Sequence, residues 1–374
     1  MTGDDPGGDV GARDVDPPST AFRPRTPAAR TNGRRVWSRH PLRSAAVAVA
    51  VLVAVVLVAG FLWIDSQANP SGPRGRQVVV TVASGTGTDR FAQLLVDHGV
   101  IGSALAFRIW IAIHGNPGVD AGSYAFDRND SFGAVKDVLD GGPNVFELQV
   151  PPGFTVAEVA TRLGQFPGED PVAFERLATS GAVRSPWQPP GVTSLDGLLG
   201  TGSYQVLPGE TGTQLLTQMV DRFDSQANAL GLTTGAAAIG LTPYQAITMA
   251  SIVEKEGVIQ KNLGPVARVI LNRLSQGIPL QMDSTVLYAE GRDGGTVTSK
   301  DLQLQTPYNT YLNKGLTPTP ICFPSTAALA ATLDPPPGSW LYFVVVQPDG
   351  TEAFSTTFAQ QLANEALASR RGLP

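Results

Sequence analysis

The stretch Ala250-Ser-Ile-Val-Glu-Lys-Glu-Gly257 closes an apolar segment that begins at Thr242-Pro243. Thr242 suits the N-cap of a helix, Pro243 suits its first position, and Gly257 suits its end. At about 100° per residue, one broad arc of this helix collects most of its apolar side chains. They are Ala246, Ile247, Met249, Ala250, Ile252 and Val253. The pattern predicts a helix that buries one broad apolar face.

Two glutamates interrupt the apolar face at the end of this helix. Glu254 falls inside one edge of the arc and Glu256 inside the other, whereas Lys255 points to the opposite, solvent-facing side. An apolar wall favours the neutral form of a carboxyl group, which is the form a general acid needs. The helical wheel alone favours a plainer interpretation, in which both glutamates are solvated residues at a helix end.

An uncharged run rich in Val, Ala and Leu occupies residues 45–64. At about 1.5 Å per residue it can span a hydrocarbon core of roughly 30 Å. Arginines precede it and a polar stretch starting at Asp65 follows, so the positive-inside rule places the N-terminus in the cytoplasm and the rest outside. The arginines are Arg30, Arg34, Arg35, Arg39 and Arg43. A cleaved signal peptide would have a shorter apolar run of roughly 7–15 residues. We therefore predict a single-pass anchor in the cell membrane.

The composition argues against several other functions. Residues 1–44 are a mixture of Gly, Pro, Asp and Arg and are predicted to be a disordered cytoplasmic segment. The single cysteine, Cys322, excludes an intramolecular disulfide, and three histidines without zinc-type spacing offer no metal site. A net charge of −5 gives no support to a nucleic-acid partner. We expect neither a metal nor a cofactor.

Beyond a linker over 65–76, the chain alternates strand, glycine turn and capped helix. Strands are expected at 77–82, 124–126 and 145–150, and helices at 88–98, 105–113, 132–139 and 155–163. This order predicts a small βααβ domain over 77–150 and a mixed domain over 151–374. Later elements are helices at 210–230, 266–276 and 359–370 and a strand at 340–346. The fold class is α+β with one N-terminal transmembrane helix.

Two further segments, residues 280–288 and 305–311, combine amide, carboxylate or hydroxyl side chains with aromatic or apolar ones. If residues 280–288 are extended, Gln281, Asp283 and Thr285 share one face. Residues 305–311 bring two tyrosines and an asparagine into one turn. Amide, hydroxyl and aromatic groups are suited to sugar recognition, although each segment alone also fits an ordinary polar loop.

Together and in this order, the motifs resemble those of the endolytic murein transglycosylases, the YceG-like or MltG family, over residues 76–365. They are Ala-Ser-Ile-Val-Glu-Lys-Glu at 250–256, Asn272-Arg-Leu274, Leu-Gln-x-Asp-x-Thr-Val-x-Tyr at 280–288, Tyr-Asn-Thr-Tyr at 308–311, Gly315-Leu-x-Pro-x-Pro-Ile321 and Leu-Tyr-Phe-Val at 341–344. The resemblance implies a LysM-like small domain and a YceG-like catalytic domain. It implies a lyase that cuts peptidoglycan glycan strands between MurNAc and GlcNAc and leaves 1,6-anhydroMurNAc ends.

The same resemblance implies Glu254 as the catalytic acid and then base, and leaves Glu256 as a flanking residue. A single carboxyl group serves this reaction without a metal or a water nucleophile. The implied glycan-binding residues are Asp196, Gln281, Asp283, Thr285, Tyr288, Tyr308, Asn309 and Tyr311. The implied partners are glycan strands, the cell membrane and peptidoglycan synthases, with a role in terminating strand elongation.

Some positions depart from the family pattern. Asp196 stands where glutamate is usual, Ser284 replaces a proline, and Gln360-Gln361 replaces a Glu-His pair. These departures keep two alternatives open. One is a scaffold that binds glycan and synthases without cutting, and the other is a two-carboxylate hydrolase that uses Glu254 with Asp283.

Overall fold

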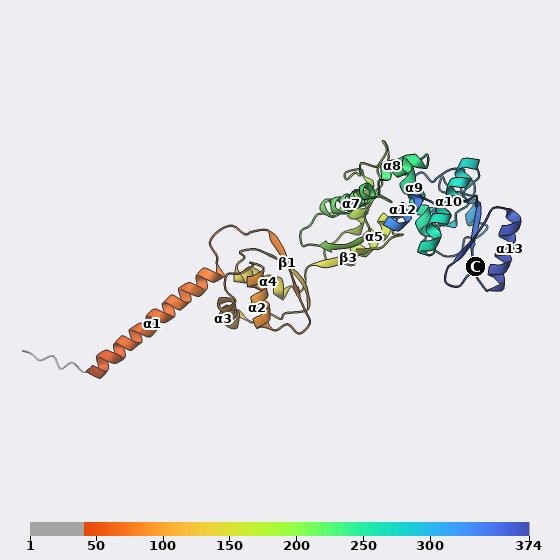
Figure 1. The fold of residues 1–374 in the computed structure, drawn as a ribbon. Helices are drawn as coiled ribbons and strands as arrows, with labels where there is room; N and C mark the ends of the chain where they lie inside the picture. The colour runs from red at the N-terminus through yellow and green to blue at the C-terminus, as the bar shows by residue number, and fades with distance from the viewer. Residues whose placement is uncertain (1–40, 374) are drawn as a thin grey trace, which may run out of the picture. The chain divides into compact units, whose positions relative to one another are not determined.

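The computed structural model, drawn in Figure 1, describes residues 41–373. The chain divides into two compact units at Phe61–Leu62. The described part of the first unit is helix α1 (Pro41–Ala68), which continues into the second. Residues Arg43–Ala68 of α1 contain an 18-residue stretch with a mean hydropathy of 3.0 and are long enough to cross a membrane, which agrees with the predicted apolar helix. The predicted disorder of residues 1–44 is wrong for residues 41–44, which form the first turn of α1, while residues 1–40 and the arginines before Arg43 lie outside the described residues.

The small domain has the expected βααβ order. Its elements are β1 (Gln77–Val82), α2 (Thr88–Asp97), α3 (Ala104–His114) and β2 (Gly122–Asp127), followed by α4 (Phe132–Asp140). Strands β1 and β2 pair antiparallel, from Gln77 opposite Asp127 to Val82 opposite Gly122. The aromatic side chains of Phe91, Phe107 and Tyr124 are fully buried between the strands and helices. Its likeness to a LysM domain stays a prediction.

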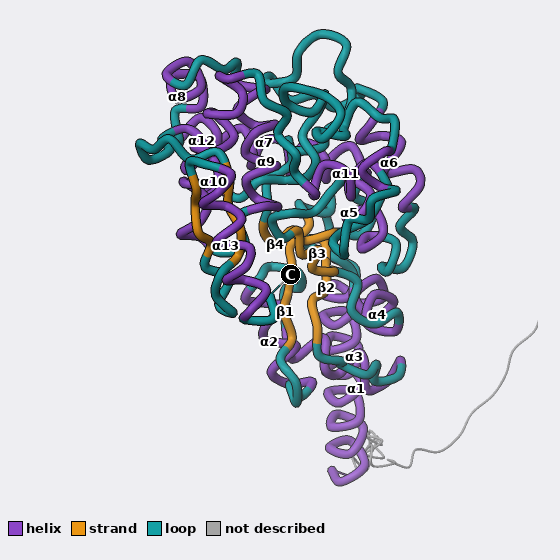
Figure 2. The backbone as a smooth tube through the Cα atoms, turned by 90° about the vertical axis from the view of Figure 1, so that its right-hand side faces the viewer, coloured by secondary structure: helices purple, strands orange, loops and turns teal. Residues whose placement is uncertain are grey.

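Strand β3 (Phe146–Val150) pairs and packs with residues that follow it in the sequence. It pairs antiparallel with β4 (Gly202–Val206), from Phe146 opposite Val206 to Val150 opposite Gly202 (Figure 2). Leu148 and Val150 point into a core that they share with α5 (Val156–Leu163) and α7 (Gly212–Ala229). The domain boundary predicted after residue 150 assigns β3 to the small domain. Its strand partner and the core that buries its side chains both lie in the larger domain that follows.

Helices form in several stretches where none was expected, among them α6 (Pro171–Thr179), α8 (Leu232–Ala238) and α12 (Thr326–Leu333). Helix α6 lies within residues 164–203, a segment rich in Gly, Pro and Ser. The Asp170 side chain accepts hydrogen bonds from the backbone amides of Val172 and Ala173, both at 3.0 Å, and Pro171 takes the first helical position.

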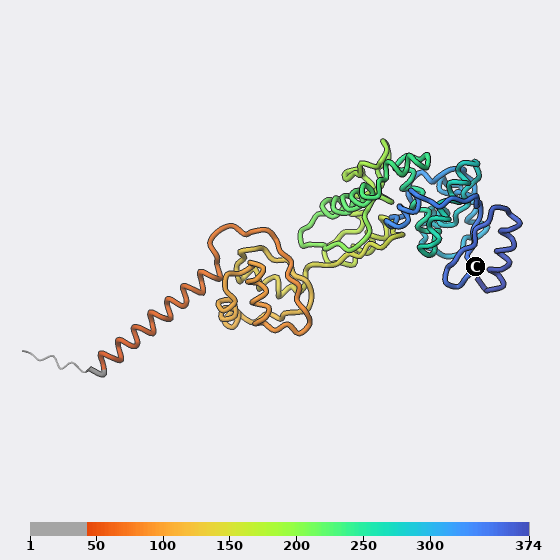
Figure 3. The backbone as a smooth tube through the Cα atoms, viewed as in Figure 1, coloured from red at the N-terminus to blue at the C-terminus, as the bar shows by residue number. Residues whose placement is uncertain are grey.

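Helix α9 (Pro243–Glu256) has the predicted bounds and lies at the centre of the second half of the chain. Thr242 and Gln245 form a reciprocal capping box, with N···O distances of 2.9 and 3.2 Å. All six residues of the predicted apolar arc are fully buried. Thr248 and Ser251, outside that arc, are buried too, so α9 is enclosed on nearly every side. Its neighbours are α8 (Leu232–Ala238), α10 (Gln260–Gln276) and α12 (Thr326–Leu333). Figure 3, coloured by residue number, shows that these helices come from separate parts of the sequence.

The extended conformation expected for residues 280–288 is wrong beyond Met282. Residues Asp283–Ala289 form helix α11, with Asp283 in the first turn, where a carboxylate interacts favourably with the helix dipole. Arg273 fixes the segment before the helix by donating to the carbonyl oxygen of Leu280 at 2.6 Å. Beyond it lie a short 3₁₀ turn η1 (Asp301–Gln303), the hairpin β5 (Tyr342–Val345) with β6 (Glu352–Ser355), and α13 (Phe358–Arg370).

Candidate active site

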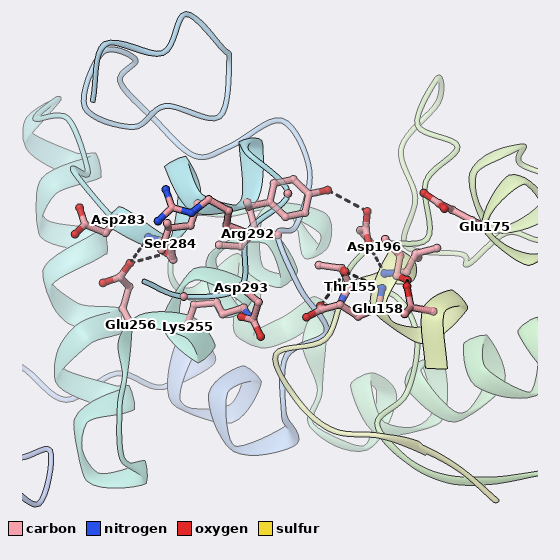
Figure 4. A pocket seen from close by; sticks show the side chains of 18 of the residues that line it. Thr155, Glu158, Glu175, Asp196, Lys255, Glu256, Asp283, Ser284, Arg292 and Asp293 are labelled. Atoms are coloured by element: carbon pink, nitrogen blue, oxygen red, sulfur yellow. Dashed lines mark hydrogen bonds and ion pairs between the residues drawn. The ribbon is translucent and has the colours of Figure 1, made fainter. Parts of the chain in front are cut away.

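A cavity of about 630 Å³ opens beside the C-terminal end of α9 (Figure 4). Its walls come from α5, α6, the end of α9, α11 and the glycine-containing loop after α11. Eight of the 19 lining residues are charged: Glu158, Glu175, Asp196, Lys255, Glu256, Asp283, Arg292 and Asp293. Six of these eight are acidic, so the cavity is suited to carboxyl chemistry.

Glu256 is the last residue of α9 and lies in the cavity wall. Its Oε1 atom accepts a hydrogen bond from the Ser284 hydroxyl at 2.6 Å and one from the Ser284 backbone amide at 3.2 Å (Figure 4). Burial raises the pKa of the Glu256 carboxyl group, and the negative charge of Asp283 raises it further, while the two Ser284 hydrogen bonds lower it in part. The neutral form of Glu256 is therefore easier to populate than that of a solvent-exposed glutamate, and the side chain lies at a cavity surface.

Glu254 does not line this cavity. Its Oε2 atom accepts hydrogen bonds from the backbone amide of Ser325 at 2.8 Å and from the Ser325 hydroxyl at 2.5 Å. Ser325 is the N-cap of α12 and also accepts from the Ala328 amide. Glu254 thus holds the start of α12, and its role as the catalytic acid stays a prediction. The helical wheel placed both glutamates at the edges of the apolar arc but could not show which edge meets the cavity.

Lys255, expected to point into solvent, is a second correction. Its side chain is 22 % exposed, lines the cavity, and forms an ion pair with Asp293 at 2.5 Å. Arg292, next to Asp293, pairs with Glu290 at 2.7 Å and with Asp301 at 3.3 Å. These ion pairs hold the loop over residues 291–294 as one wall of the cavity, which is why Lys255 turns toward it.

Asp196 ties two walls of the cavity together. Its Oδ1 atom accepts from the backbone amide of Val156, at the start of α5, at 2.9 Å. Its Oδ2 atom accepts from the Tyr288 hydroxyl of α11 at 3.0 Å and from the Ser194 hydroxyl at 3.2 Å. Burial raises the pKa of Asp196, and these three hydrogen bonds oppose the effect.

Asp283 and Tyr288 also line the cavity, and their role in binding stays a prediction. The Tyr311 hydroxyl donates to Asp283 at 2.5 Å, and the Tyr308 ring lies 5.1 Å from the Tyr288 ring. Tyr311 and Tyr308 therefore lie one contact behind the cavity lining.

The other three expected residues have structural contacts. Asn309 is fully buried and donates to the carbonyl oxygens of Leu302 and Leu304, both at 2.9 Å. Thr285 is fully buried against the Thr310 hydroxyl at 2.9 Å, and Gln281 accepts from Arg273 at 3.3 Å. These residues shape the segments that carry the lining residues rather than the lining itself.

Sequence reasoning missed the parts of the cavity that other elements contribute. Thr155 and Glu158 form the capping box of α5 at the cavity edge, with the Thr155 amide 2.8 Å from Glu158 Oε2. Their Thr-x-x-Glu spacing is a signal for a helix start, although it carries no hint of a cavity. Ser284 stood out in the sequence only as a departure from the family pattern.

The fold and the cavity define an α+β protein with a central buried helix that presents a carboxyl group of raised pKa to a cavity. The chain belongs to the YceG-like family, whose model matches residues 80–366.

Two proteins named endolytic murein transglycosylase are similar to this chain in sequence. The protein from Bacillus subtilis (strain 168) is 26 % identical over 331 residues, which cover 82 % of this chain and 89 % of that protein. The protein from Streptococcus pneumoniae serotype 2 (strain D39) is 25 % identical over 310 residues, 74 % of this chain and 55 % of that protein, so this chain spans about half of the pneumococcal relative. A crystal structure of a YceG-like protein from Listeria monocytogenes superposes with a TM-score of 0.54 and 25 % identity over 77 % of this chain and 98 % of that one.

Proposed function

We propose that this protein is a membrane-anchored lytic transglycosylase that cleaves MurNAc–GlcNAc bonds inside peptidoglycan strands and leaves 1,6-anhydroMurNAc ends. The names of its relatives support the substrate and the reaction class. The observation that carries the proposal is Glu256, a carboxyl group of raised pKa in the wall of the cavity.

In the proposed reaction, Glu256 serves first as the acid and then as the base. Its neutral carboxyl group gives its proton to the glycosidic oxygen as the bond from that oxygen to the MurNAc anomeric carbon breaks. The resulting carboxylate takes the proton of the sugar's 6-hydroxyl while O6 bonds to the anomeric carbon. The proton count balances, and no water is consumed. Because both Ser284 donors lie on Oε1, Oε2 is the atom we assign to the proton transfer.

The remaining roles follow from the walls of the cavity. We assign Asp283 and Tyr288 to glycan binding, with Tyr311 and Tyr308 as the side chains that hold them. Asp196 sets the distance between α5 and α11, and Gln281, Thr285 and Asn309 support the binding segments. Helix α1 anchors the chain, with the arginine-rich N-terminus in the cytoplasm. Peptidoglycan synthases at the same membrane are its proposed partners.

A second candidate function, hydrolysis, has one observation in its favour. Asp283 lines the same cavity as Glu256, and its charge raises the pKa of Glu256. Two carboxyl groups that share a cavity can act as acid and base on a water molecule.

Digestion of purified peptidoglycan by the full-length protein in detergent, with products weighed by mass spectrometry, tests the proposal. We expect anhydro-muropeptides from the interior of strands. Products heavier by one water would assign hydrolysis instead. Glycan binding without any cleavage would assign the scaffold role and contradict the enzymatic one.

A further inference from the structure

Helix α3 of the small domain is apolar on nearly every side. Among its residues Ala104–His114, only Arg108 and His114 carry ionisable side chains. One face, with Ala106, Phe107 and Ile111, is buried in the core of the small domain. A helix that is apolar all round is normally enclosed, either by protein or by lipid.

The opposite face of α3 is uncovered within the described part of the chain. Leu105, Ile109 and Ile113 are 52 %, 38 % and 73 % exposed. Their spacing of four residues places them in a single stripe along the helix. Among residues 77–145, these are the only exposed large apolar side chains. Such clustering on one helix face indicates an interaction surface rather than scattered surface residues.

The end of α1 lies beside the start of α3. Ala68, the last residue of α1, is 4 % exposed and belongs to the core of the small domain. The Oε1 atom of Gln67 lies 2.6 Å from the position that a Cβ atom at Gly102 would take. The end of α1 therefore contacts the backbone just before α3. Ile64, the last residue of the predicted span, is four residues before Ala68, or about 6 Å along a helix. The start of α3 therefore lies close to Ile64 within the same unit, Leu62–Pro374.

We propose that the stripe formed by Leu105, Ile109 and Ile113 rests in the interfacial layer of the membrane that anchors the chain. An 11-residue helix is about 16 Å long, too short to cross a bilayer but suited to lie in its interface. Trp110, partly buried and stacked on His114 at 4.1 Å, adds an aromatic side chain of the kind enriched at that depth. The inference rests on the proposed membrane anchoring by α1, and it fixes the small domain at the lipid surface.

The test uses the full-length protein in nanodiscs that hold one copy each, so that a second copy cannot cover the stripe. A polarity-sensitive fluorophore is attached to a cysteine introduced by Ile109→Cys or Ile113→Cys, in a Cys322→Ser background. The lipids carry bromine on their acyl chains, which quenches a fluorophore that contacts them. Val53→Cys in α1 is the reference for anchoring, and Gln93→Cys on the exposed side of α2 is the matched control in the same domain.

We expect the labels at positions 53, 109 and 113 to lose most of their emission and the label at 93 to keep it. Quenching at 53 with positions 109 and 113 behaving like 93 would overturn the α3 proposal and leave the anchoring intact. Absence of quenching at 53 would overturn the anchoring and the α3 proposal together.

Discussion

Glu254 and Glu256 make chemically similar hydrogen bonds but lie next to different parts of the protein. Each accepts the hydroxyl and the backbone amide of a serine at the start of a helix, Ser325 of α12 for Glu254 and Ser284 of α11 for Glu256. Residues two apart on a helix are about 200° apart, so the two carboxyl groups face different neighbours. Glu256 faces the cavity, where burial raises its pKa, and Glu254 faces α12. Position relative to the cavity, rather than residue type, distinguishes the proposed acid from its neighbour.

Ser284→Ala tests how the serine holds the proposed acid. Loss of the hydroxyl removes a hydrogen bond that favours ionised Glu256, so the pKa of Glu256 rises and the alkaline limb of the kcat/KM profile moves to higher pH. We expect kcat to fall roughly tenfold, since a hydrogen bond to a charged group contributes about 1.5 kcal/mol. Ser284→Thr, which restores a hydroxyl, should recover the original profile. An unchanged pH profile in the alanine variant would show that Ser284 does not act through Glu256.

Helix α9 was predictable because its signals are local. Thr242, Pro243 and Gly257 mark its ends, and its apolar arc marks its buried face. Helix α6 was missed although Asp170-Pro171 is a local start signal, because the surrounding Gly, Pro and Ser residues concealed it. Helix α11 was missed because the alternation of polar and apolar residues over 280–286 also fits a strand. Its register depends on contacts with Arg273 and Thr310, which are distant in sequence or unmarked by any pattern.

The cavity was only partly predictable for the same reason. The motif order brought Asp196, Asp283 and Tyr288 into consideration, and the structure brings all three to one cavity with Glu256. The choice between Glu254 and Glu256 requires the positions of α11 and α12. Those positions come from packing between segments up to about 70 residues apart, and a helical wheel contains no such information.

The Glu254–Ser325 contact should stabilise α12 rather than catalysis. Ser325→Ala removes the N-cap of the helix and one donor to Glu254. We expect the free energy of unfolding to fall by about 1–2 kcal/mol, as for other N-cap losses, with kcat/KM retained within a few-fold. Thermal unfolding of the full-length protein in detergent, together with the digestion assay, measures both quantities. A large loss of activity at unchanged stability would instead place Ser325 in the reaction.

Asp196 should connect α5 with α11 in a way that the amide of asparagine does not fully replace. Asp196→Asn keeps the size of the side chain but offers one acceptor oxygen for Val156, Ser194 and Tyr288 together. We expect a loss of about 1–3 kcal/mol of stability, the typical effect of leaving a buried polar group unpaired. Tyr288→Phe removes one of the same hydrogen bonds, so the double variant should lose less than the sum of the two single variants. Full additivity would show that the two side chains do not act as a pair.

At the scale of the whole molecule, the order of its parts followed from the sequence, but one boundary did not. The apolar helix, the βααβ elements and the later helices and strands follow one another in the expected order. Strand β3 was assigned to the small domain because it resembles β1 in pattern. Its partner, β4, lies about 50 residues further along the chain, and strand partners at that separation are not encoded locally.

A buried carboxyl group links the stability of the whole molecule to pH. Glu352 on β6 is 7 % exposed, and its Oε2 atom has no hydrogen-bond partner within residues 41–373. Burial, followed by the negative charge of Glu256, raises the pKa of Glu352 to about 8. The folded-state pKa lies above the unfolded value, so the folded state loses stability as the pH rises from the unfolded pKa of about 4.3 through 8.

Glu352→Gln removes this titration. The unfolding temperature of the variant should rise relative to wild type between pH 5 and pH 9 by several degrees, since about 1 kcal/mol corresponds to roughly 2–4 °C in a domain of this size. Thermal melts of both proteins at pH 5, 7 and 9 give the comparison. A difference between the two proteins that stays constant with pH would show that Glu352 does not titrate in this range.

We propose Glu256, and not Glu254, as the acid of the reaction. The most direct measurement compares the release of anhydro-muropeptides from purified peptidoglycan by Glu256→Gln and Glu254→Gln, with folding checked for both by thermal unfolding. General acid–base catalysis contributes about 10²–10⁴-fold, so Glu256→Gln should lose at least about a hundredfold in rate while unfolding as a folded protein does. Glu254→Gln should keep most of its activity and unfold at a lower temperature, because it weakens the contact with Ser325. Loss of release in Glu254→Gln, with release undiminished in Glu256→Gln, would contradict the assignment.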